Sequence, residues 1–218
     1  MNKYTASLTA ESFLYDETTV LATLLLQGLD VETISERNLS ENLISCKKPA
    51  ALKRLNSILV DRLYVMNDRL LDPFLNNDIY NSRIILLYII CKTDKLVRDF
   101  ILNIYGDKII TRNDKITRSD MEKFFVKICE DEQKLLEASD SSKAKIKTVL
   151  MRLLVSAGVA EKITNEEFRI IKPVMTEFTK RSILDDGGGD FLRALGEVLW
   201  LLKSVSTNSE TKLFLANS

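Results

Sequence analysis

The stretch SSKAKIKTVLMRLLVSAGVAEKITNEEFRIIK, residues 141–172, indicates the fold of this chain more clearly than any other. Its first half repeats apolar residues at i, i+3, i+4, i+7, i+8 and i+11, which predicts a helix with one buried face that ends at Gly158. Two short apolar runs then flank the polar turn TNEE, which favours a β-hairpin over residues 159–172. The alternative is a helix start, because Thr164-x-x-Glu167 also fits a capping box. The buried helix face would consist of Ile146, Val149, Leu150, Leu153, Leu154 and Ala157.

The positions of this helix outside its buried face carry several cations. Residues 141–160 contain four basic residues and no acidic one. Lys143 falls in the first turn and Lys147 on the flank, and the side opposite the buried face carries Lys145, Thr148 and Arg152. Cations near a helix N-terminus oppose its macrodipole, at a cost of about 0.3–1 kcal/mol each. Their placement therefore indicates a role other than helix stability.

An earlier part of the chain follows the same plan. Residues 42–60 also contain four basic residues and no acidic one, and Pro49 is placed to open a long helix that reaches about Val65. In each half a helix and a short helix precede a long helix that starts with cations. We interpret this as a two-fold internal repeat.

Two helices, a basic third helix and a hairpin form the winged helix-turn-helix arrangement, whose third helix enters the DNA major groove. The cations of the hairpin, which include Lys172, would contact phosphates as a wing. The alternative interpretation is an ordinary solvated charged face. The candidate DNA-binding residues are Lys47, Lys48, Lys53, Arg54, Lys143, Lys145, Lys147, Thr148, Arg152, Lys162 and Arg169.

Composition supports a mostly helical, cored protein. Only 7 glycines and 3 prolines occur in 218 residues, too few for a turn-dense sandwich or barrel. Histidine is absent, which excludes Ser-His-Asp triads, HExxH zinc helices and histidine pH switches. The 31 basic and 31 acidic residues sum to zero, yet the acid-free windows show that the charge is segregated locally.

We expect an all-α protein of two helix-turn-helix-like subdomains, the second one winged. The first would span residues 1–106 and end at Gly106, and a polar, basic linker would follow over 107–118. The second would span 119–203 and open with the capping box Ser119-x-x-Glu122, before a polar tail at 204–218. The longest apolar run, residues 84–91, is far shorter than the ~20 residues of a membrane span, so it predicts a buried helix.

The three cysteines support neither a zinc site nor a disulfide framework. Cys46, Cys91 and Cys129 are widely spaced, odd in number and without a CxxC pair. Reduced thiols and the lack of a signal peptide at the start favour a cytoplasmic protein.

Enzyme chemistry finds little support. A nuclease would need clustered carboxylates for Mg²⁺, and the nearest set is Asp185, Asp186 and Asp190 with Glu210 and Lys212. Those aspartates flank Gly187–Gly189 in a loop that we interpret as a hinge or linker. The glycines also lack the strand and the lysine of a phosphate-binding loop. We expect no enzyme, no metal and no cofactor.

Several segments resemble the BrxA family, the small A component of BREX bacteriophage-exclusion systems. The opening YTASLTAESFLYDETTVLATLLLQGLD, with Glu17 and the Ala22-x-Leu24-x-Leu26-x-Gly28 run, is similar to the start of that family. KLVRDF at 95–100 and VLMRLLVSAG at 149–158 also resemble it, and the likeness covers about residues 4–200. It implies a small, helical, non-enzymatic protein, likened to the NusB fold and to paired winged helices, that binds double-stranded DNA.

The sequence thus predicts a DNA-binding accessory protein of phage defence that contacts mostly phosphates and has no membrane span. Other BREX components are possible partners. The alternatives are a protein–protein adaptor within the defence complex and an RNA-binding, NusB-like protein.

Overall fold

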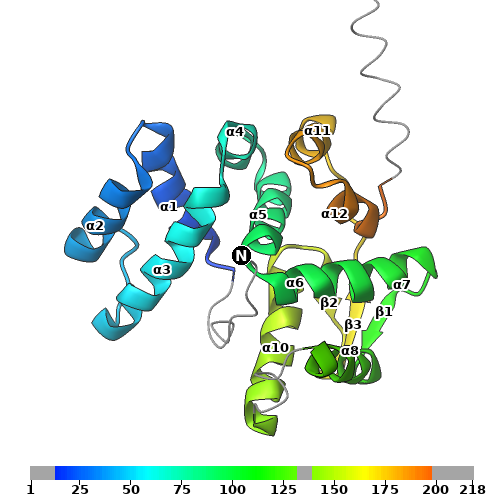
Figure 1. The fold of residues 1–218 in the computed structure, drawn as a ribbon. Helices are drawn as coiled ribbons and strands as arrows, with labels where there is room; N and C mark the ends of the chain where they lie inside the picture. Colours follow the sequence, from blue (N-terminus) through cyan, green and yellow to red (C-terminus); the bar gives the residue numbers. More distant parts are fainter. Residues whose placement is uncertain (1–12, 132–138, 198–218) are drawn as a thin grey trace, which may run out of the picture.

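The computed structural model describes residues 13–131 and 139–197. The described chain is mainly helical, as predicted, with one small antiparallel sheet (Figure 1). Its elements in chain order are α1 (Tyr15–Leu26), α2 (Val31–Glu41), α3 (Pro49–Val65), α4 (Asp68–Asn76), α5 (Ile79–Thr93), α6 (Lys95–Phe100), the π-helical turn η2 (Ile101–Tyr105), α7 (Gly106–Ile110), β1 (Lys115–Thr117), α8 (Arg118–Asp131), α10 (Asp140–Ser156), β2 (Ala160–Lys162), β3 (Glu167–Ile170), α11 (Glu177–Asp185) and α12 (Gly189–Ala194).

Local sequence signals account for most helix boundaries. The Asp30 carboxylate caps α2 by accepting a hydrogen bond from the Thr33 N–H at 2.8 Å, and Pro49 opens α3 as predicted. Gly28 and Gly158 follow the ends of α1 and α10 with φ of +91° and +77°, a region that favours glycine. Caps of this kind satisfy backbone groups that would otherwise lack partners.

Helix α5 forms the centre of the core. Residues 84–91 are all buried, which confirms the buried helix predicted from this apolar run. Helices α3, α4, α6 and α11 pack around α5, so its apolar side chains contact protein in several directions. Within the described residues, no helix is both long and apolar enough to cross a membrane.

Helices α6, η2 and α7 follow one another without a break, so the prediction that Gly106 ends a helix is wrong. Gly106 has helical φ and ψ of −62° and −42°. A Cβ at this residue would lie 3.1 Å from the Cβ of Ala194, so glycine allows α12 to approach closely. The tight packing explains the glycine here.

The segment expected as a linker contains secondary structure. The end of α7 lies in it, and β1 pairs antiparallel with β3, giving the sheet order β1-β3-β2. Strands β2 and β3 form the predicted hairpin, so Thr164 and Glu167 do not start a helix. The division of the chain into two subdomains stays a prediction.

The capping box of α8 lies two residues before the predicted one. The Thr117 N–H and hydroxyl both donate to the Asp120 carboxylate at 2.8 Å, and the Asp120 N–H donates back to the Thr117 hydroxyl at 3.4 Å. The Ser119-x-x-Glu122 prediction is therefore wrong: the chain leaves β1 and enters the helix directly at Arg118.

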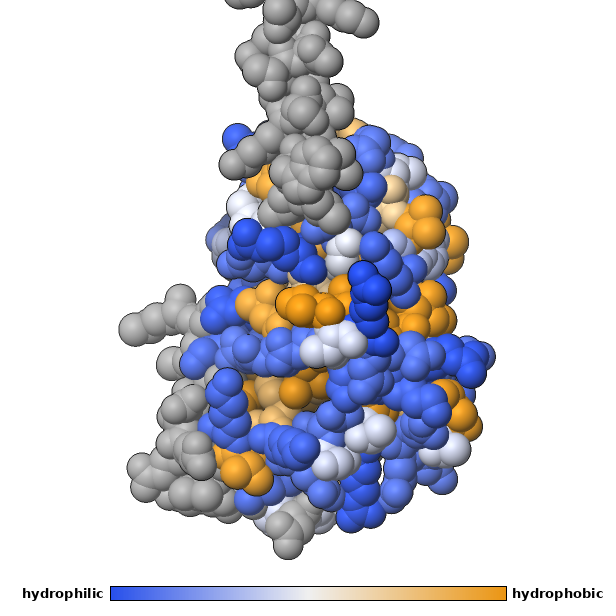
Figure 2. Space-filling view, turned by 90° about the vertical axis from the view of Figure 1, so that its right-hand side faces the viewer, coloured by the Kyte–Doolittle hydropathy of each residue, from blue (hydrophilic) through white to orange (hydrophobic). Residues whose placement is uncertain are grey.

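After the hairpin the chain returns to the first helices, where α11 packs against α4 and α5. Helix α12 ends at Ala194, and Gly196 follows with φ of +88°. The last residues of the predicted second subdomain, 198–203, and the predicted polar tail at 204–218 lie outside the described residues. Seen from the side of α7, α8 and α12, the surface is mainly hydrophilic with an apolar band across its middle (Figure 2).

Candidate nucleic-acid interface

A groove of about 640 Å³ lies between the start of α8, one side of α10 and the β2–β3 hairpin. We call it the basic groove, because four cations line it together with one carboxylate. Its lining includes the polar residues Arg118, Lys147, Thr148, Arg152, Lys162 and Glu166 and the apolar residues Ile116, Met121, Met151, Val155 and Phe168.

Helix α10 supplies one wall of the basic groove because its apolar face fixes its orientation. All six residues of the predicted apolar face are buried. Lys145, Thr148 and Arg152 are exposed, as the helical period predicts. At the start of the helix the Ser139 hydroxyl accepts from the Ser142 N–H at 3.2 Å. Lys143 lies in the first turn and is half-buried.

The predicted wing cations Lys162 and Arg169 lie on different faces of the hairpin. Lys162 pairs in register with Phe168, and both line the basic groove. Arg169 follows Phe168 in the strand, so its side chain points to the other face, where it forms an ion pair with Glu161 at 3.3 Å. Strand β1 adds Ile116, the cross-strand partner of Phe168 on the groove side.

Arg118 belongs to the basic groove, but it was not among the predicted site residues. The capping box places it in the first turn of α8. There its Nε contacts Glu122 at 2.8 Å and its Nη1 contacts Glu166, in the hairpin turn, at 2.8 Å. Both hydrogen bonds raise the pKa of Arg118, and the one with Glu122 lowers the pKa of Glu122. Its sequence neighbours gave no signal for this role, because Glu166 is 48 residues away.

The other three groove cations have no ion-pair partner among the described residues. Lys147 Nζ lies 5.4 Å from the centroid of the Phe125 ring, a cation–π contact. Within the part of the chain that the structure describes, Lys147, Arg152 and Lys162 form no ion pair. Cations elsewhere commonly do, as in the pair between Lys108 and Asp120 at 2.8 Å. Three unpaired cations around one concavity favour an anionic ligand.

The first basic window forms a separate surface. Lys47 and Lys48 lie in the loop before α3, Lys53 and Arg54 in its first half, and all four are exposed. Across the described residues, none of the four forms an ion pair. Helix α3 packs against α1, α2 and α5, on the opposite side of Figure 1 from the sheet. The structure therefore does not bring the two basic windows into one groove.

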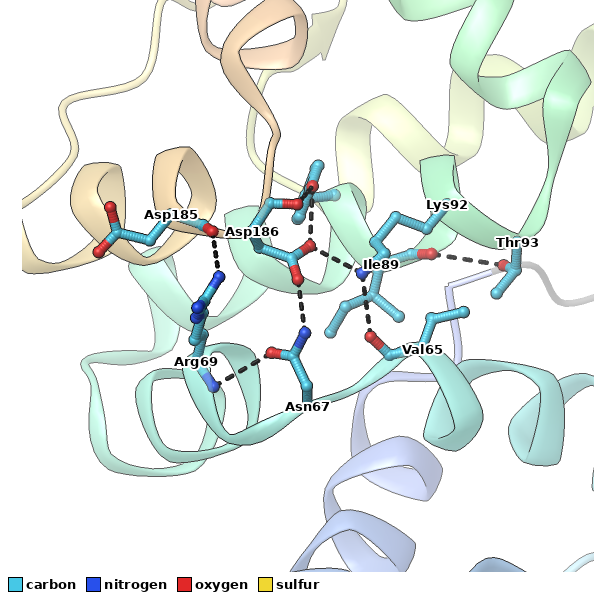
Figure 3. Close-up of polar contacts among 9 residues, drawn as sticks. Val65, Asn67, Arg69, Ile89, Lys92, Thr93, Asp185 and Asp186 are labelled. Atoms are coloured by element: carbon cyan, nitrogen blue, oxygen red, sulfur yellow. Dashed lines mark hydrogen bonds and ion pairs between the residues drawn. The ribbon is translucent and has the colours of Figure 1, made fainter.

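The loop between α11 and α12 is tied to α5 and to the α3–α4 connection by the carboxylate of Asp186 (Figure 3). The Asp186 carboxylate accepts hydrogen bonds from Asn67 at 2.6 Å, Lys92 at 2.7 Å and Tyr88 at 2.9 Å. Burial would raise the pKa of Asp186, but these donors outweigh it and lower the pKa. Asp190 pairs with Arg193. The described residues contain no group of three or more His, Cys, Asp or Glu placed to hold a metal ion, and Glu210 and Lys212 lie outside them.

Two of the cysteines can be placed. Cys46 is half-buried and Cys91 is buried, and both are free thiols. Burial raises the pKa of Cys91 far above its usual value, so the thiol stays protonated. The side chain of Cys129 lies outside the described residues.

Comparison with known proteins gives three likenesses. The sequence profile of the BrxA family matches residues 2–186. A protein of Bacillus cereus (strain H3081.97) described as "BREX protein BrxA" is 25% identical over 199 residues, covering 91% of this chain and 94% of that protein. The crystal structure of an uncharacterized protein from Magnetospirillum magneticum has a TM-score of 0.73 at 18% identity, over 88% of this chain and 97% of that one. This last likeness shows a shared fold.

Proposed function

Because this chain belongs to the BrxA family, and is thereby a component of a BREX phage-defence system, we propose that it serves that system as a non-enzymatic protein that binds double-stranded DNA. The observation that carries the proposal is the basic groove. It gathers Lys147, Arg152 and Lys162 on one concave face with no ion pair among the described residues. The proposal includes a cytoplasmic location, because that is the compartment that injected phage DNA reaches.

The binding mode is phosphate contact with little sequence preference. Lysine and arginine dominate the predicted set, and these residues mainly contact phosphates, which position a protein on DNA without reading its sequence. Thr148 is exposed beside them on α10 and can donate its hydroxyl to a phosphate oxygen. The cations at the start of α3 provide a second, separate phosphate-binding surface in the same proposal.

The test is a salt titration of duplex binding. We compare wild type with a variant in which Lys147, Arg152 and Lys162 are all changed to glutamine. The slope of log K against log salt is about −0.9 for each neutralised phosphate, so three lost contacts reduce its magnitude by about 2.7. Fluorescence anisotropy with a labelled duplex measures both affinity and slope.

A charge-matched control distinguishes the effect of the groove cations on binding from the effect of the protein's net charge. The control changes three cations outside the groove to glutamine, namely Arg37, Lys115 and Arg193, each of which forms an ion pair. This triple change removes the same positive charge as the groove variant. We expect this control to bind duplex nearly as wild type does. Equal slopes for wild type and the groove variant would refute the assignment of the groove.

Other nucleic acids and partners distinguish the alternatives. Tighter binding of RNA than of duplex DNA would favour an RNA-binding role. An absence of binding to any nucleic acid at about 50 mM salt, together with co-purification of other BREX components, would favour an adaptor. Circular dichroism of each variant checks that it is folded.

A further inference from the structure

The floor of the basic groove does not suit duplex DNA. The exposed surface inside the groove is predominantly apolar. We call Lys147, Arg152 and Lys162 its rim, because they line the same groove and Arg152 and Lys162 are exposed. Val155 of α10 is 39% exposed in this floor and Ala144 is exposed on the same helix, while Met121 and Met151 lie beneath them with buried side chains. A duplex offers phosphates to the rim, but its outer surface has no apolar ridge to cover the floor. We therefore expect a second kind of ligand, one with an apolar surface that can cover the floor.

The shape of the groove suits a short helix. Ala144 and Val155 both line it and are 11 positions apart on α10, which corresponds to about 16 Å, or three helical turns.

The charges at the rim select an acidic partner. Lys147, Arg152 and Lys162 form no ion pair within the described residues, and they flank the apolar floor. An apolar core with a polar rim is the usual organisation of a protein–protein interface. Carboxylates on both sides of an apolar stripe would complement this rim.

One end of the groove carries an ion pair that a partner can replace. Arg118 reaches from α8 to Glu166 in the hairpin turn at 2.8 Å, and both side chains are more than 60% exposed. An ion pair so exposed adds little net stability, so an incoming carboxylate can take the place of Glu166 on Arg118.

We propose that the basic groove binds an acidic amphipathic helix of a partner protein, and that this helix and duplex DNA exclude each other there. The exclusion rests on the proposed DNA binding, because Lys147, Arg152 and Lys162 would serve both ligands. The peptide binding does not depend on it. The arrangement would let a partner release DNA from this face.

The test uses a fluorescein-labelled synthetic peptide of about 12 residues, or three helical turns. It carries leucine at i, i+3, i+4 and i+7 and glutamate at the other positions. We expect saturable binding by the full chain in fluorescence anisotropy, and no binding of the peptide with lysine in place of glutamate. Unlabelled peptide should displace a labelled duplex.

Variants separate the floor from the rim. Val155→Asn removes apolar floor without a change of charge, so it should weaken the peptide at least about tenfold while it leaves the salt slope of duplex binding unchanged. Val126→Asn is the matched control, because Val126 is 62% exposed on α8 and outside the groove. Glu166→Gln should strengthen peptide binding by a factor of up to about five, because it removes one of the two carboxylates that contact Arg118.

The outcomes are distinct. The proposal is overturned if Val155→Asn leaves peptide binding unchanged. It is also overturned if the protein binds single-stranded DNA and Val155→Asn weakens that binding, because bases would then occupy the floor. A protein that binds the peptide but no duplex refutes the DNA-binding function and the exclusion, and supports the peptide site alone.

Discussion

Asp186 offers a sharp test of how the second half of the chain is held to the first. Its carboxylate is 5% exposed and accepts from Asn67, Tyr88 and Lys92, which come from the α3–α4 connection and from α5. Lys92 Nζ also donates to the Val65 carbonyl at 3.1 Å. The change Asp186→Ala removes all three contacts and leaves the Lys92 ammonium without its carboxylate.

The expected cost is about 3 kcal/mol of unfolding free energy. A hydrogen bond to a charged group contributes about 1.5–3 kcal/mol, but three that share one acceptor do not add. Removal of one partner of a buried pair costs about 3–5 kcal/mol, and Lys92, at 26% exposed, can recover some hydration. Asp186→Asn keeps one acceptor oxygen and should cost about half as much.

Urea denaturation followed by circular dichroism measures this loss. Asp185→Ala is the matched control: its side chain is exposed and only its carbonyl accepts from Arg69, so we expect a change below about 0.5 kcal/mol. A double-mutant cycle with Lys92→Met should give a coupling of about 1–3 kcal/mol. Zero coupling, or an Asp186→Ala variant as stable as wild type, would refute the reasoning.

The same contact predicts a dependence of stability on pH. The folded pKa of Asp186 is lowered, so its contribution is present above the unfolded value of about 3.9 and is lost as the pH falls through the lower folded value. The stability difference between wild type and Asp186→Asn should therefore shrink in acid. A difference that stays constant from neutral pH to below the folded pKa would contradict this.

Three further predictions concern the core. Gly188→Ala should cost about 2–3 kcal/mol in urea denaturation, because the new Cβ would lie 2.5 Å from Ile183 Cγ2, and an unchanged midpoint would contradict this packing. Arg62→Met should cost about 2 kcal/mol in the same assay, because the buried guanidinium donates to a buried carbonyl at 2.7 Å that would lose its partner. Cys91 should resist iodoacetamide in the native protein and react after unfolding, while half-buried Cys46 reacts first, as peptide mass mapping can follow.

Local patterns in the sequence predicted the helices and the hairpin well. Helical period, Asp30 and Pro49 act within a few residues of themselves, so the start of α2, the span of α3 and the buried face of α10 could be read without tertiary information. The capping box of α8 was misplaced by two residues, because two overlapping Ser/Thr-x-x-acid patterns compete and only the pairing of β1 selects Thr117.

The candidate site was predicted in part. The positions of Lys147, Arg152 and Lys162 follow from helical and strand periods once the buried face is known. Arg118 could not be found in this way, because its place in the groove depends on β1 pairing with a strand about 50 residues later. Local patterns also could not show that Lys162 faces the groove and Arg169 does not, because only the register of the hairpin decides this.

The sequence by itself determined that this is a helical protein with segregated charge, because period, capping residues and acid-free windows are properties of neighbouring residues. Only the tertiary structure decided which charges meet. Asp186 and Lys92 are 94 residues apart, and nothing near either residue in the sequence indicates the other. The physical reason is that chain packing, and not local propensity, brings such pairs together. Packing places the Asp186 carboxylate in a structural contact, and it places Lys147 and Arg152 of α10 along one wall of a groove.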